Sequence, residues 1–194
     1  MEVTIADVLR YYIGWKDTDE RLITGIKNGD VNCFYAYLKG MKVLRNFKKD
    51  TYKEIFKLAK KYVDKNPEKF DIEEFSKQLC KSDYLAKNNK SAIVAASKIL
   101  WTFDRNKTVI QDSKAKETLE KLKGKRIHDY KEYCEYWEKQ YELFKPLYLK
   151  TIKESGIAKS DSLFNEDWFI RRTFDNYLWN RGKAEEKSKS KEKK

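Results

Sequence analysis

Residues that interrupt helices are scarce along this chain, which has only 7 Gly and 2 Pro among its 194 residues. Gly and Pro are the strongest local breakers of regular structure, and their scarcity in a chain dominated by Leu, Ile, Lys, Glu and Tyr argues for mostly helix. The composition therefore predicts an all-α fold with short connections. The length is sufficient for a real hydrophobic core, in one domain or in two small helical lobes.

Apolar residues recur at helical spacing in successive segments. We expect helices at residues 3–13, 21–27, 31–44, from 51 onward, 71–79, 91–103, 114–122, 129–154 and 165–181. The segment 14–20 is typical of a turn, since it joins a Gly to a run of polar residues. Residues 183–194 are low in complexity and rich in Lys, so we expect a disordered tail after a body that spans residues 1–182.

The formal net charge is +12, and the tail explains only part of it. The tail holds six Lys and three Glu, which leaves +9 for the body. A basic surface favours binding to a polyanion such as DNA, because counterions are released when the protein neutralises its phosphates. A Lys-rich protein that binds no polyanion carries the same charge, so the charge alone leaves both readings open.

Other functional classes have little support in the sequence. The cysteines Cys33, Cys80 and Cys134 are widely spaced and odd in number, and His128 is the only histidine, so we expect neither disulfides nor a metal site. No cofactor motif is present. No stretch reaches the apolar length of a transmembrane helix, and the N-terminus lacks a secretory signal pattern, so we expect a cytoplasmic protein without a membrane partner. We expect a monomer.

The stretch from residue 88 to 119 contains the most apolar helix of the chain. Lys90 precedes this helix, and the extended run Thr108-Val109-Ile110 follows it and leads to Asp112. An amine of lowered pKa can attack C1′ of a nucleotide and form a Schiff base, and a carboxylate beside it can stabilise an oxocarbenium-like sugar. The alternative is ordinary packing, with Lys90 facing solvent and Asp112 acting as a helix N-cap.

Asp175 and Trp179 form a second candidate pair, because residues four apart lie on one face of a helix. An indole can stack on a nucleobase while a carboxylate accepts hydrogen bonds from its exocyclic N–H groups. The alternative is an amphipathic helix with Trp179 in the core.

The polar turn Leu-Ala-Lys-Asn-Asn-Lys-Ser, residues 85–91, is a candidate phosphate-binding loop. Asn88 and Asn89 tolerate left-handed backbone angles, so a tight turn before a helix can present backbone N–H groups to a phosphate. We expect Lys87, Asn88, Asn89 and Ser91 to contact DNA. The alternative is a loop that only joins two helices.

Three runs together resemble the helix-hairpin-helix DNA glycosylases, and most closely the archaeal-type 8-oxoguanine glycosylases. They are Lys-Ser-Ala-Ile-Val-Ala-Ala-Ser-Lys-Ile at 90–99, Thr-Val-Ile-Gln-Asp-Ser at 108–113 and Phe-Asp-Asn-Tyr-Leu-Trp at 174–179. The resemblance covers the central third of the chain and the last helix. The sequence Lys-Asn-Asn-Lys stands where the family has a Gly-x-Gly hairpin, and the first 80 residues have no counterpart.

The resemblance implies a two-lobed helical domain with a cleft between the lobes and a helix-hairpin-helix-like unit at about 71–122. It implies that Asp112 is the catalytic aspartate, Lys90 the Schiff-base lysine, and Asp175 with Trp179 the base pocket; Lys98 matches a second, structural lysine. The implied activity is excision of a modified base from double-stranded DNA, either an oxidised purine in repair or a glucosylated cytosine in phage defence. Strand cleavage by an associated lyase activity would depend on Lys90.

Two non-catalytic classes remain alternatives. One is a helical DNA-binding protein without chemistry, which needs the positive charge and the hairpin but neither Lys90 nor Asp112. The other is a protein-interaction domain, whose contact surface would be the aromatic-rich segment 129–148.

Overall fold

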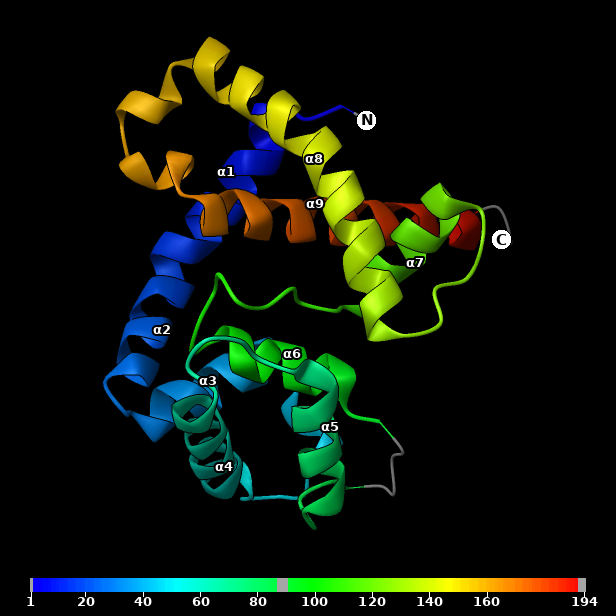
Figure 1. Cartoon of the computed structure of the whole chain (residues 1–194). Coiled ribbons are helices and arrows are strands. Elements are labelled where there is room, and N and C mark those ends of the chain that lie inside the picture. Colours follow the sequence, from blue (N-terminus) through cyan, green and yellow to red (C-terminus); the bar gives the residue numbers. More distant parts are fainter. Residues whose placement is uncertain (1, 87–90, 192–194) are drawn as a thin grey trace. The chain divides into compact units, whose positions relative to one another are not determined.

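The computed structural model describes residues 2–86 and 91–191, with side chains up to Gly182 (Figure 1). Within these residues no strand forms, and the only β-type pairing is an isolated bridge between Phe47 and Leu85. The all-α prediction is confirmed. No helix in the same residues is long and apolar enough to cross a membrane.

The chain divides into two units, each with its own core. Unit 1 comprises Met1–Ile13 and Gln111–Lys194, and unit 2 comprises Gly14–Ile110. The division falls inside the segment 71–122 that we expected to act as one central element. The predicted cleft between two lobes stays a prediction.

The described residues of unit 2 form five α-helices, and two of them begin at an Asp that caps the helix with its side chain. They are α2 (Glu20–Lys27), α3 (Val31–Gly40), α4 (Tyr52–Lys65), α5 (Ile72–Lys81) and α6 (Ile93–Trp101). The side chain of Asp30 caps α3 by accepting from Asn32 N and Cys33 N, and Asp71 caps α5 through Glu74 N. These contacts satisfy backbone donors that have no partner within the helix.

Residues 14–20 are not the turn that we expected. Gly14 adopts helical angles (φ −59°, ψ −36°), and Trp15–Asp19 form a π-helix that leads into α2. Trp15 is only 3 % exposed. The polar side chains that suggest a turn lie on the outside, and burial of one indole holds the backbone in a helical path.

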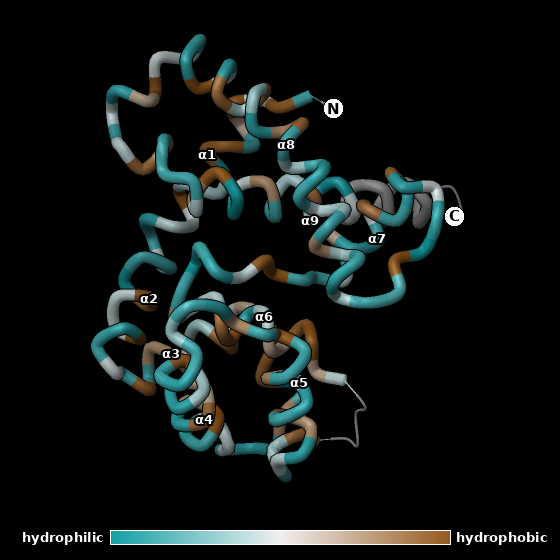
Figure 2. Tube along the Cα trace, in the orientation of Figure 1, coloured by the Kyte–Doolittle hydropathy of each residue, from teal (hydrophilic) through white to brown (hydrophobic). Residues whose placement is uncertain are grey.

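Helix α6 is the centre of unit 2, and all its residues from Ala95 to Trp101 are buried. Hydrophobic colours prevail along it in Figure 2. A helix that is apolar all round is normally buried on all sides, and α6 follows this rule. Lys98 is buried with it at 7 % exposure, and its Nζ lies 3.5 Å from the carbonyl oxygen of Met41.

Unit 1 contains α1 (Ile5–Gly14, whose last residue falls in unit 2), α7 (Ser113–Lys123), α8 (Tyr130–Ser155) and α9 (Asp167–Lys191). Helix α9 is longer than expected, because its backbone continues into the Lys-rich segment that we predicted to be disordered. The aromatic face of α8 is core and not an exposed contact surface, which argues against the protein-interaction reading. Its fully buried members are Tyr133, Trp137, Tyr141, Phe144 and Tyr148.

Helices α7 and α9 pack closely enough to require Gly182. A Cβ at this position would lie 2.8 Å from Lys114 O and 2.9 Å from Thr118 Oγ1. Thr118 Oγ1 also donates a hydrogen bond to Leu178 O at 2.9 Å, so its hydroxyl is fixed in the interface. We expect Gly182→Ala to lower the free energy of unfolding by about 1–3 kcal/mol, because backbone has to shift.

Urea unfolding followed by circular dichroism measures this effect. Gly14→Ala is the matched control, since Gly14 has helical angles and no atom lies within 4 Å of the position that its methyl group would take. Alanine there is expected to raise the free energy of unfolding by about 0.5–1 kcal/mol. Equal effects of the two substitutions would contradict the close packing of α7 on α9.

Candidate functional site

Asp112 lies at the point where the extended segment ends and α7 begins. Its backbone is extended (φ −118°, ψ 143°), and its side chain accepts a hydrogen bond from Lys114 N at 3.0 Å. The carboxylate is half-buried beside the positive end of the helix dipole. The predicted N-cap role of Asp112 is confirmed, and the capping hydrogen bond fixes the position of its carboxylate.

Tyr133 of α8 connects Asp112 with Asp175 of α9. Its side chain is fully buried, and its hydroxyl is hydrogen-bonded with the backbone of Asp112. Burial raises the pKa of the Tyr133 hydroxyl well above its ordinary value, and the charges of Asp175, Cys134 and Asp112, in that order, add to the rise. The Tyr133 hydroxyl is therefore within electrostatic reach of both carboxylates. Two of the residues predicted from sequence thus act on one hydroxyl in unit 1, and we call Asp112, Tyr133 and Asp175 the Tyr133 cluster.

Asp175 is the most deeply buried carboxylate of this cluster, at 6 % exposure. Its Oδ1 accepts a hydrogen bond from Trp137 Nε1 at 2.9 Å, and its Oδ2 lies 3.5 Å from a guanidinium nitrogen of Arg172. Burial raises the pKa of Asp175 to about 6, although Arg172 and Trp137 both oppose the rise. A carboxyl group with this pKa exchanges its proton near neutral pH, as a general acid or base must.

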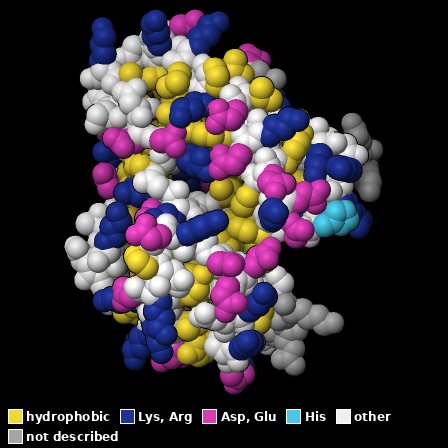
Figure 3. Space-filling model, in the orientation of Figure 1, with side chains coloured by type: hydrophobic (Ala, Val, Ile, Leu, Met, Phe, Trp, Pro, Cys, Tyr) yellow, Lys and Arg dark blue, Asp and Glu magenta, His cyan; other side chains and the backbone are white. Residues whose placement is uncertain are grey.

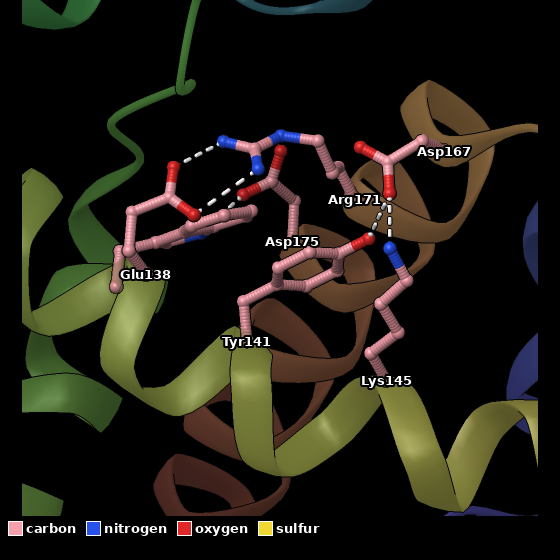
Figure 4. Close-up of polar contacts among 7 residues, drawn as sticks. Glu138, Tyr141, Lys145, Asp167, Arg171 and Asp175 are labelled. Carbon is pink, nitrogen blue, oxygen red and sulfur yellow. Dashed lines mark hydrogen bonds and ion pairs between the residues drawn. The ribbon is translucent and has the colours of Figure 1, made fainter.

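Arg171 of α9 pairs with Glu138 of α8, as Figure 4 shows, and stacks on two aromatic rings of the same helix. Its guanidinium makes a two-pronged ion pair with Glu138 and lies over the rings of Trp137 and Tyr141, 4.7 and 5.1 Å from their centroids. Paired planar contacts of this kind restrict the arginine to one geometry. The contacts of Arg171 therefore fix the indole of Trp137, whose N–H donates to Asp175.

A second polar group fixes the beginning of α9 against α8 (Figure 4). Asp167 Oδ1 accepts hydrogen bonds from the Tyr141 hydroxyl at 2.9 Å and from Lys145 Nζ at 2.7 Å. Burial raises the pKa of Asp167, but the hydrogen bonds from Lys145 and Tyr141 outweigh it, so the pKa lies below its ordinary value. The two groups together determine the register of α8 and α9, and hence the position of Asp175.

The indole bonded to Asp175 is Trp137, which we did not single out from the sequence. Trp179 lies half-buried on α9, one turn after Asp175. The spacing of the aromatic residues in α8 places Trp137 in one helical stripe with residues 133, 141, 144 and 148. Its partner on another helix could not be read from that spacing.

Four of the predicted site residues, Lys87, Asn88, Asn89 and Lys90, lie outside the described residues. Ser91 is described and is exposed in the connection before α6. The next residue is anchored, because Ala92 N donates a hydrogen bond to the buried Ser76 Oγ at 2.8 Å. The proposed contacts of the turn with DNA stay predictions.

Metal-binding side chains do not gather in the described ranges: no group of three or more His, Cys, Asp or Glu there is placed to hold an ion. Comparison of the chain with protein-family models, with curated proteins and with solved structures gives no match. The resemblance to glycosylases therefore depends on the three sequence runs given above.

Replacing Trp137 with Phe tests the geometry around Asp175. Phe keeps an aromatic ring under Arg171 but removes the N–H that donates to the carboxylate. A hydrogen bond to a charged group contributes about 1.5–3 kcal/mol, so its loss is expected to raise the pKa of Asp175 by a further 1–2 or so above about 6.

The carboxyl carbon signal of Asp175 in an NMR titration reports this pKa. Trp168→Phe is the control, because Trp168 also lies on α9 but contacts the ring of Phe169. An unchanged titration in the Trp137→Phe variant would refute the hydrogen bond.

Proposed function

We propose that this protein is a DNA glycosylase, which flips a modified base out of duplex DNA, cleaves its N-glycosidic bond and leaves an abasic site. The observation that supports it best is the Tyr133 cluster. Asp112 and Asp175 were selected from separate runs of the sequence, and the charges of both act on one buried tyrosine hydroxyl, which is also hydrogen-bonded with the backbone of Asp112. We take the substrate to be an oxidised purine or a glucosylated cytosine of phage DNA.

In the proposed reaction Asp112 stabilises the positive charge that develops on the sugar as the N-glycosidic bond breaks. The departing base takes the bonding electron pair and gains a proton. Lys90 supplies the amine that bonds to C1′, and loss of a proton with opening of the sugar ring gives a Schiff base. Hydrolysis of that Schiff base releases the abasic site, and β-elimination from it would cut the strand.

Asp175 and Trp179 are the proposed receptors of the flipped base. A carboxylate offers about four acceptor positions, and the hydrogen bonds from Trp137 and Arg172 use two of them. The remaining capacity suits exocyclic N–H groups of a base, while the half-buried indole of Trp179 offers a face for stacking. Flipping costs least for damaged or weakly paired bases, and this contributes to selectivity.

The test is incubation with a panel of duplexes that carry oxidised, deaminated, alkylated or glucosyl-hydroxymethylated bases, scored for abasic sites. We expect abasic sites on one class of modified duplex and none on unmodified DNA. Trapping with borohydride then examines Lys90, since a Schiff base becomes a stable adduct and Lys90→Gln removes it. Absence of abasic sites on the whole panel would count against the glycosylase.

A second candidate function is duplex DNA binding without chemistry. The geometry of Asp112 favours it, because its side chain accepts a hydrogen bond from Lys114 N and capping the helix is enough to explain its presence there. This function predicts salt-sensitive binding to DNA of any sequence and no abasic sites on modified DNA.

A further inference from the structure

Helix α4 carries a row of lysines along a groove in unit 2. Lys57, Lys60, Lys61 and Lys65 line a hollow of about 600 Å³, together with Val31, Phe56 and Asp64. Lys57, Lys61 and Lys65 follow one another at intervals of four residues and Lys60 comes three after Lys57, so the four lie on one broad side of the helix. All four are exposed.

The floor of this groove is apolar and firmly held. Phe56 is 6 % exposed and packs against Phe34 and Phe103, with ring centroids 5.1 and 5.9 Å away. Lysine stems lie readily along such a surface while their ammonium groups stay in water. The groove therefore has an apolar base and a cationic rim, and its position is fixed by the core of unit 2.

The positive charge of this groove is not neutralised within the part of the chain that the structure describes. None of the four lysines makes an ion pair there, and Asp64 is the single carboxylate among the lining residues. Some lysines on other helices do make ion pairs, as Lys116 does with Glu120 and Lys131 with Glu135. Figure 3 shows Lys and Arg side chains gathered over α4, at the lower left of that view.

We propose that the α4 groove binds the phosphate backbone of duplex DNA. From Lys57 to Lys65 the helix rises about 12 Å, which spans roughly three to four phosphates of one strand. Lysines are point charges that attract phosphates without reading bases, so this contact positions the DNA independently of its sequence. The inference rests on the proposed function for its partner, and it gives a role to the segment that the resemblance leaves without a counterpart.

The experiment measures binding to an unmodified duplex by fluorescence anisotropy over a range of salt concentrations. One variant carries Lys57→Gln, Lys60→Gln, Lys61→Gln and Lys65→Gln. We expect the slope of log Kobs against log salt to become shallower by about 3–4, at about 0.9 for each phosphate that the variant no longer neutralises. Circular dichroism checks that the variant keeps its helices, since all four side chains are exposed.

A matched control removes the same charge from unit 1, through Lys131→Gln, Lys139→Gln, Lys150→Gln and Lys153→Gln in α8. All four are exposed as well. We expect the control to keep most of the slope. An equal reduction of the salt slope in both variants would show that only net charge matters, and this would overturn the inference. An unchanged slope in the α4 variant would overturn it too, as would a wild-type protein that does not bind the duplex.

The binding measurement separates this inference from the proposed reaction, because unmodified DNA has no base to excise. Loss of the slope in the α4 variant, with no abasic sites formed on the panel by the wild type, would support the groove and refute the glycosylase. Abasic sites on the panel, with the slope unchanged in the α4 variant, would support the glycosylase and refute the groove.

Discussion

Replacing Asp112 with Asn is expected to lower the rate of base excision by about 10²–10³, with the fold intact. The amide oxygen of Asn can still accept the hydrogen bond from Lys114 N, and Asn caps helices about as well as Asp does. The substitution therefore removes the negative charge and little else. Single-turnover excision from the substrate found with the panel measures the change, and urea unfolding measures stability.

Asp129→Asn is the matched control for this result. Asp129 also caps its helix with its side chain, which accepts from Glu132 N three residues on, whereas Asp112 accepts from the N–H two residues on; Asp129 is exposed. We expect this variant to excise at the wild-type rate. If Asp112→Asn keeps full excision, Asp112 is a cap alone and the catalytic role assigned to it is wrong.

The second large effect is a fall in stability with rising pH that originates in Asp175. Its pKa is about 6 in the folded protein and 3.8 as the ordinary value, so the folded state binds this proton more tightly. The stabilisation that protonated Asp175 gives the folded state is fully present below the pKa of the unfolded state. It is lost as the pH rises through the pKa of the folded state. A pKa difference of about two corresponds to roughly 3 kcal/mol.

Asp175→Asn is expected to remove this fall, because the amide cannot ionise. Urea unfolding at about pH 4.5, 6 and 7.5 is the measurement, with the variant more stable than the wild type at the highest pH. Glu132, whose pKa is lowered to about 2 by the backbone N–H of His128 and by Lys123, loses its contribution only in more acidic solution. The same pH dependence in wild type and variant would show that Asp175 is not the source.

The helices could be predicted from sequence because their signals are local. Asp30, Asp71, Asp112 and Asp129 stand before apolar periodic segments, and each caps a helix in the structure. The errors have tertiary causes. Residues 15–19 are helical because Trp15 is buried, and the aromatic stripe of α8 faces the core, which sequence alone cannot distinguish from a contact surface.

The candidate site could be predicted only in part. Asp112 and Asp175 follow from motif and spacing, but their common electrostatic effect on Tyr133 depends on how α8 packs against the other helices of unit 1. The pKa of Asp175 likewise depends on burial, which no local pattern encodes. The lysines of α4 are visible in the sequence as the outer face of an amphipathic helix, whereas the groove beside them is not.

The most direct test of the account is mass spectrometry of what the wild-type protein releases from duplex DNA that carries the modified bases of the panel. The account predicts a free modified base and a strand that retains an abasic sugar, with release reduced in Asp112→Asn and kept in Asp129→Asn. Binding of the same duplexes without release of any free base, or release of nucleotides in place of bases, would contradict it.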